Sequence, residues 1–158
     1  MKAVYFVLLL ALGAPQASVA AKCSLSEAQR SLSSVSYVGP ITKEVRGKAI
    51  DFSRFVFQNN SKSKVKFAAF DGDEPLAIHP HSTYLETNTP AGWRHEDPTL
   101  DSYPPAILKA VRPGDSFSFL IESRKDQATE FRLTLSDQRN CEYKSQPFRF
   151  EVGKKAAN

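Results

Sequence analysis

The 158-residue sequence lacks several features that many activities require. It has two cysteines, one methionine, no Gly-x-Ser-x-Gly sequence and no glycine-rich phosphate loop. Two cysteines are too few for a disulfide-dense mini-protein or a cysteine-rich zinc domain. The missing motifs exclude the usual signatures of serine hydrolases and phosphate-loop enzymes. We therefore expect a protein that is not an enzyme, with no catalytic residues and no cofactor.

A strong charge of one sign is also missing, because 21 basic residues face 17 acidic ones and the net charge is +4. The densest basic cluster is Lys62, Lys64 and Lys66, whose alternation places it on one solvent face of a strand. Proteins that bind nucleic acid show a basic stripe together with a recognisable motif. We expect no nucleic-acid partner, and the charge is interpreted as a solubility feature.

Long hydrophobic runs are absent except at the start of the chain. Residues 4–12 are apolar, follow Lys2 and precede the small residues 17–21, which is the pattern of a secretory signal peptide. Cleavage after Ala20 or Ala21 fits equally well. A membrane span needs about 17 to 25 apolar residues, so a transmembrane anchor is the weaker alternative. We expect a periplasmic or secreted protein with no membrane anchor after cleavage.

The two cysteines, Cys23 and Cys141, lie at opposite ends of the mature chain. Acylation of Cys23, as in a lipoprotein, requires a small residue before it, and Lys22 occupies that position. In an oxidising compartment an even pair of cysteines is expected to form a disulfide. The sequence therefore predicts a Cys23–Cys141 bridge.

Alternating hydrophobic residues predict short β-strands through most of the chain. The alternation changes parity between Phe52 and Phe55, which predicts a bulge near Ser53 and Arg54. The segments that alternate, or are rich in β-branched and aromatic residues, are 35–37, 49–58, 64–70, 76–78, 84–85, 106–111, 117–121, 131–135 and 148–152. Before them, residues 24–32 are expected to form a short helix with a capping box of Ser24 and Glu27.

Many short strands separated by turns, with no helix–strand alternation, indicate an all-β antiparallel sandwich with a short N-terminal helix. A closed barrel is the main alternative. The expected organisation is a signal peptide at 1–21, the helix and first strand at 22–47, the sandwich core at 48–153 and a disordered tail at 154–158.

One long segment, 88–105, does not fit this pattern. It contains four prolines, the only tryptophan and no convincing strand, so we expect a long loop. Loops longer than about 12 to 15 residues are uncommon and often functional. Tryptophan, tyrosine and arginine dominate protein interfaces. The candidate partner-binding residues are Trp93, Arg94, Leu100 and Tyr103. The alternative role of Trp93 is to plug one end of the hydrophobic core.

All three histidines fall between His79 and His95, with His81 two residues after the first. Together with nearby carboxylates they are weak candidates for a zinc or copper site. We expect no metal, because no helical pair of histidines exists and Pro80 distorts the spacing. Asn59 begins a glycosylation sequon that matters only in a eukaryotic source.

Three segments resemble the immunoglobulin-like domains of bacterial extracytoplasmic proteins. They are 57–61 (FQNNS), 111–119 (VRPGDSFSF) and 145–152 (SQPFRFEV), and the likeness covers about residues 48–152. The resemblance implies an immunoglobulin-like sandwich. It departs from antibody domains, because Cys23 lies outside the sandwich and no Cys–Trp–Cys spacing exists. Fold resemblance implies little about function.

These observations favour a non-catalytic exported binding protein. A small exported domain with a rigid protruding loop is typical of an inhibitor or immunity protein that binds a secreted or periplasmic protein. Two alternatives stay open. One is a zinc- or copper-binding protein that uses His79, His81 and His95, and the other is an adhesion or assembly accessory domain.

Overall fold

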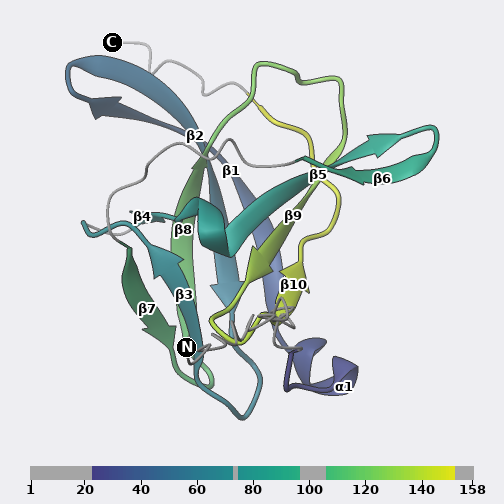
Figure 1. The fold of residues 1–158 in the computed structure, drawn as a ribbon. Helices are drawn as coiled ribbons and strands as arrows, with labels where there is room; N and C mark the ends of the chain where they lie inside the picture. The colour runs from purple at the N-terminus through teal and green to yellow at the C-terminus, as the bar shows by residue number, and fades with distance from the viewer. Residues whose placement is uncertain (1–22, 73–74, 97–105, 152–158) are drawn as a thin grey trace, which may run out of the picture.

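The computed structural model describes residues 23–72, 75–96 and 106–151, and these ranges are mostly β-structure (Figure 1). This confirms the all-β class. The expected signal peptide and C-terminal tail lie outside the described residues. The strands are β1 (Ser34–Val45), β2 (Lys48–Gln58), β3 (Val65–Ala69), β4 (Leu76–Ala77), β5 (Thr83–Thr89), β6 (Gly92–His95), β7 (Ile107–Val111), β8 (Ser116–Glu122), β9 (Phe131–Ser136) and β10 (Glu142–Lys144).

The strands form three separate sheets, ordered β1-β2-β8-β4, β10-β9-β5-β6 and β3-β7. Neighbouring strands are antiparallel except β4 and β8, which pair in parallel over two residues. A short 3-10 helix, η1 (Pro80–Ser82), connects β4 to β5. No helix of the described residues is long and apolar enough to cross a membrane.

A phenylalanine-rich core lies between the sheets. Phe55 and Phe119, from the paired strands β2 and β8, have ring centroids 5.7 Å apart. Phe57 contacts Phe67 of β3 at 4.8 Å and Tyr143 of β10 at 5.1 Å, so one ring joins all three sheets. Aromatic pairs in such edge and offset arrangements add to the free energy of burial. The alternation of hydrophobic residues therefore predicted the buried core positions of these strands correctly.

The expected bulge near Ser53 and Arg54 is wrong. β2 pairs without interruption with β8 from Phe52 to Gln58. The irregularity lies in β1, where the register shifts between Tyr37 and Gly39. The hydrophobic residues change parity along β2 because its two ends bury opposite faces: Phe55 faces the core, whereas Phe52 lines a cavity.

The N-terminal helix is shorter than expected. α1 spans Glu27–Arg30, and its capping box uses Ser26 and Gln29 in place of Ser24 and Glu27. None of its residues is buried, so the helix contributes little to the core. It is held to the fold by the predicted disulfide between Cys23 and Cys141, whose Cα atoms lie 4.6 Å apart. This confirms the pairing, and a structural disulfide indicates an oxidising, extracytoplasmic environment.

Three strand predictions need correction. The segment expected to close the fold is 148–152; its described part, 148–151, makes only an isolated bridge between Phe148 and Phe131, although Phe148 and Phe150 are buried. β10 was not predicted, because three residues are too short to show alternation. The beginning of the expected long loop is the antiparallel hairpin of β5 and β6, in which Asn88 pairs with Trp93.

Candidate functional site

The outer side of the sheet β10-β9-β5-β6 carries an organised group of aromatic and charged side chains. In β9 the side chains of Phe131, Leu133 and Leu135 are buried in the core, so Arg132 points to the opposite side. Residues paired across strands share a face. The registers therefore place the following residues together, and we call them the aromatic–ionic face: Tyr84, Glu86, Trp93, His95, Arg132, Thr134 and Lys144.

Glu86 is the centre of this face and is only 9% exposed. Its carboxylate accepts a hydrogen bond from Arg132 Nε at 2.7 Å and one from Lys144 Nζ at 3.1 Å. Thr134 donates a third at 3.3 Å. Burial raises the pKa of Glu86, but the hydrogen bonds and charges of Arg132 and Lys144 outweigh it and the pKa is lowered. Glu86 is therefore an anion that fixes two cations.

Trp93 packs on this ionic centre. The guanidinium carbon of Arg132 lies 4.5 Å from the centroid of the indole ring, a cation–π contact. Trp93 is half-buried and does not belong to the hydrophobic core, so it is not a core plug. Because Glu86 already orients Arg132, the positions of both the guanidinium and the indole are restrained.

Tyr84 and His95 extend the same face. The Tyr84 hydroxyl donates a 2.6 Å hydrogen bond to Glu142, and the His95 ring meets the tyrosine ring edge-on with centroids 4.2 Å apart. Burial and then the hydrogen bond to Glu142 raise the pKa of Tyr84. Tyr84 thus stays neutral at physiological pH and, with His95, adds aromatic surface with a polar hydroxyl to the face.

The structure separates the residues that the sequence grouped together. Trp93 and Arg94 are consecutive in β6, so their side chains point to opposite sides of the hairpin. Leu100 and Tyr103 lie outside the described residues. Sequence reasoning missed Tyr84, Glu86, Arg132 and Lys144. Alternation in β9 already placed Arg132 outward, but only strand pairing brings it to Glu86.

The candidate metal ligands do not come together in the described part of the chain. His79 is buried, and its ring lies 5.0 Å from that of Phe70. His95 packs on Tyr84 at the aromatic–ionic face, and the side chain of His81 is not described. Within the described ranges no group of three histidine, cysteine or acidic side chains could hold a metal. The absence of a metal in the protein stays a prediction.

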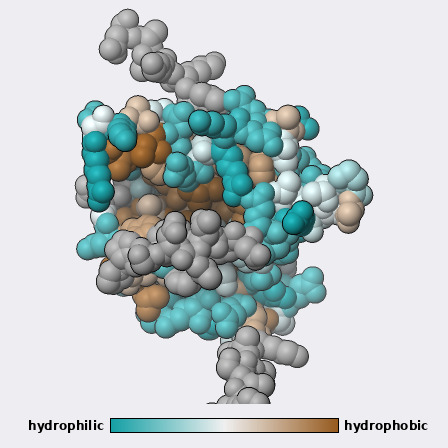
Figure 2. All heavy atoms as spheres, turned by 45° about the horizontal axis from the view of Figure 1, so that its top comes forward, coloured by the Kyte–Doolittle hydropathy of each residue, from teal (hydrophilic) through white to brown (hydrophobic). Residues whose placement is uncertain are grey.

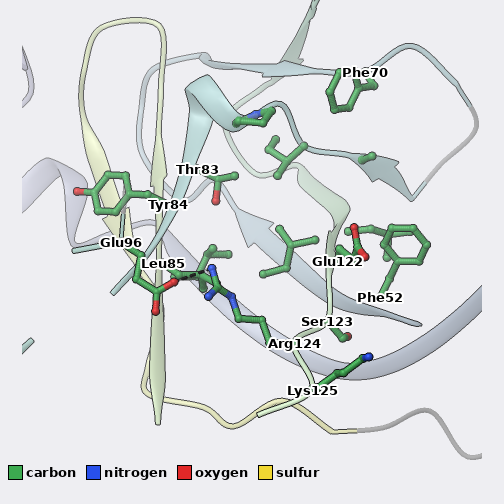
Figure 3. Close-up of a pocket in the computed structure, with 16 residues that line it drawn as sticks. Phe52, Phe70, Thr83, Tyr84, Leu85, Glu96, Glu122, Ser123, Arg124 and Lys125 are labelled. Carbon is green, nitrogen blue, oxygen red and sulfur yellow. Dashed lines mark ion pairs between the residues drawn. The ribbon is translucent and has the colours of Figure 1, made fainter. Parts of the chain in front are cut away.

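A cavity of about 830 Å³ lies beside the hairpin (Figure 3). Its apolar walls include Phe52, Leu85 and Ile121. An ion pair of 2.6 Å joins Arg124, after β8, to Glu96, after β6, and Glu96 also accepts a hydrogen bond from Thr87. This pair ties the base of the hairpin to the neighbouring sheet.

The cavity shows no arrangement for nucleophilic catalysis among the described residues. Ser123 lines it, but its hydroxyl is hydrogen-bonded to that of Ser53 at 2.8 Å. No histidine belongs to the described lining. A nucleophilic serine needs a base within hydrogen-bond reach.

No protein-family model matches the sequence, and no curated protein is similar to it.

Proposed function

We propose that this chain is a non-catalytic exported binding protein that recognises a protein partner through its aromatic–ionic face. The observation that carries the proposal is the position of Trp93, which lies outside the core against a guanidinium fixed by Glu86. A tryptophan that only stabilised the fold would be expected in the core.

The chemistry of the face fits a protein interface. Tryptophan, tyrosine and arginine are the residues that contribute most to binding free energy at interfaces. Here Trp93, Tyr84 and Arg132 are each restrained by a ring contact or hydrogen bond. Restrained side chains lose less conformational entropy when a partner binds. The face therefore supports recognition of a rigid partner surface.

Among binding proteins we favour an inhibitor or immunity protein against a secreted or periplasmic protein. The hairpin of β5 and β6 extends away from the body of the fold (Figure 1), which suits insertion into a partner. An adhesion or assembly accessory domain is the second candidate. Titration of the identified partner separates the two, because an inhibitor abolishes its activity at one equivalent and an accessory domain leaves it unchanged.

For the fold we infer an immunoglobulin-like sandwich. Its support is the pair of four-stranded sheets around a shared phenylalanine core, and the extracytoplasmic setting that the disulfide indicates. An experimental structure that covers residues 97–105 and 152–158 as well as the described ranges tests the strand order.

The experiment for recognition is site-specific photo-crosslinking in the native envelope or medium. A photo-reactive residue replaces Asn88, which is exposed and pairs with Trp93, or Arg94, an exposed control on the other side of the hairpin. We expect one protein adduct from position 88 and none from position 94. Excess wild-type protein should suppress the adduct, whereas the Trp93→Ala protein should not. Equal adducts from both positions, or equal suppression by both competitors, would contradict the proposal.

A further inference from the structure

The last residues of β1 and the first residues of β2 form a two-stranded arm that extends from the body of the molecule (Figure 1). β8 pairs with β2 only from Phe52 onward, so among the described strands the arm beyond this residue has no third strand. Its tip is a two-residue turn of Arg46 and Gly47, with φ angles of 53° and 74°. Positive φ at both positions is the geometry of a tight hairpin turn, so the arm is preformed.

The two faces of the arm differ in chemistry. Cross-strand partners share a face, and the register gives these pairs on one face: Ile41 with Phe52, Lys43 with Ile50, and Val45 with Lys48. We call this the basic–apolar face. The other face carries Thr42 with Asp51 and Glu44 with Ala49. Figure 2 shows hydrophobic surface over the arm with hydrophilic surface at its border.

Charge is divided between the faces by sign. Both acidic residues of the arm, Glu44 and Asp51, lie on the polar face, where Asp51 accepts a 2.6 Å hydrogen bond from Thr42. The basic–apolar face carries Lys43 and Lys48, and Arg46 is added at the tip. An anionic surface would therefore meet cations and aliphatic side chains together along the outer part of the arm, with Glu44 and Asp51 turned away. The nearest carboxylate on the same side is Glu122 of β8, at the base of the arm, where it pairs with Phe52.

We propose that this arm docks on an anionic lipid bilayer, with the basic–apolar face against the membrane. Val45, which is 39% exposed, would enter the boundary between headgroups and acyl chains together with Ile50. Lys43 and Lys48 have long aliphatic stems, so their ammonium groups can reach the phosphates while the stems stay in the apolar layer. Basic residues near an anionic leaflet each contribute to binding.

The size of the face favours lipid over a folded protein partner. A stable protein interface uses about 20 to 30 residues on each side. The basic–apolar face offers six side chains on a narrow two-stranded arm. A bilayer imposes no such requirement, because aliphatic burial and counter-charge suffice. The inference is independent of the proposed recognition face, which lies on another sheet.

Co-sedimentation with lipid vesicles tests the proposal. The protein purified after export is mixed with vesicles of phosphatidylcholine alone or with phosphatidylglycerol. Three double variants are exported and purified in the same way, so that they begin at the same residue as the wild type. They are Lys43→Gln/Lys48→Gln, Val45→Asp/Ile50→Asp, and the control Lys62→Gln/Lys64→Gln. The control removes the same charge from two exposed residues of the loop between β2 and β3. Thermal unfolding verifies that each variant is folded.

We expect binding to the anionic vesicles only, weakened by salt. The Lys43/Lys48 variant should bind about 20- to 30-fold more weakly, since each basic residue is worth about fivefold. The Val45/Ile50 variant should lose most binding, while the control changes it by less than about threefold. Absence of binding to anionic vesicles overturns the proposal. Equal loss in the two lysine variants also overturns it, since attraction would then depend on net charge alone.

Discussion

The side-chain amide of Asn59 donates a 2.9 Å hydrogen bond to the backbone carbonyl of Val111, and this joins the loop after β2 to the end of β7. The same nitrogen donates to the carbonyl of Ser63 at 2.9 Å, while its oxygen accepts from the backbone and hydroxyl of Ser61. Asn59 is 0% exposed. The residue that begins the sequon is thus a buried connector between two segments far apart in the sequence.

Replacement of this connector should destabilise the fold. Asn59→Ala removes the side-chain donor to the buried carbonyl of Val111 and the acceptor of the buried Ser61 N–H, and we expect a loss of about 2 to 4 kcal/mol in the free energy of unfolding. Asn60→Ala, at the exposed neighbour, is the control and should cost less than about 0.5 kcal/mol. Urea denaturation measures both. A cost for Asn59→Ala as small as that of the control would show that the hydrogen bonds are dispensable.

The Trp93→Ala change should separate binding from stability. Because the indole packs on Arg132 outside the core, we expect a loss of about 1 to 2 kcal/mol in the free energy of unfolding. A core change such as Phe57→Ala should cost about 3 to 5 kcal/mol. Affinity for the partner should fall by about 2 kcal/mol or more. The affinity is measured by calorimetry with the partner that the cross-linking experiment identifies, and Arg94→Ala is the matched control. Unchanged affinity of the Trp93→Ala protein would refute recognition through Trp93.

Acid should remove the contribution of Glu86 to stability. Its pKa in the folded state is lowered from the ordinary value of 4.5, because the hydrogen bonds of Arg132 and Lys144 exceed the effect of burial. The charge therefore stabilises the fold above about pH 4.5, and this contribution disappears as the pH falls through the lower folded-state pKa. At neutral pH, Glu86→Gln should lower the free energy of unfolding by about 1 to 2 kcal/mol.

The pH series provides the check. The difference between wild type and Glu86→Gln should shrink as the pH falls below the ordinary pKa of 4.5, while Glu122→Gln, at an exposed position, should differ little from wild type throughout. A difference that stays constant with pH would mean that the Glu86 carboxylate is not what holds the two cations.

The disulfide should stabilise the protein by restricting its unfolded state. The bridge spans 118 residues, for which the chain-entropy model gives about 4 to 5 kcal/mol. Cys23→Ser/Cys141→Ser should therefore melt well below the wild type, and reducing agent should have the same effect. The intact mass of the exported protein should be lower than that of its reduced form by two hydrogen atoms. Two free thiols or a lipid adduct on Cys23 would contradict the pairing.

The local sequence determined the strands and the bridge. Phe117 and Phe119 alternate with serines, and Phe55 and Phe57 alternate with residues that are less buried, because a strand in these sheets buries one face more than the other. The disulfide could be predicted from the number of cysteines, because two cysteines allow only one intramolecular pairing. β6 was missed because Gly92, Trp93, Arg94 and His95 show no such alternation: the strand lies at a sheet edge where neither face enters the core.

Only the tertiary structure decided what the outward-facing residues do. Glu86 and Arg132 are 46 positions apart, and their contact depends on the pairing of β5 with β9. The same pairing places Trp93 next to Arg132, because the hairpin turn connects β6 to β5. Side-chain alternation is a local property that depends only on consecutive residues. Strand register arises from packing of the whole core, so no single segment of the sequence contains it.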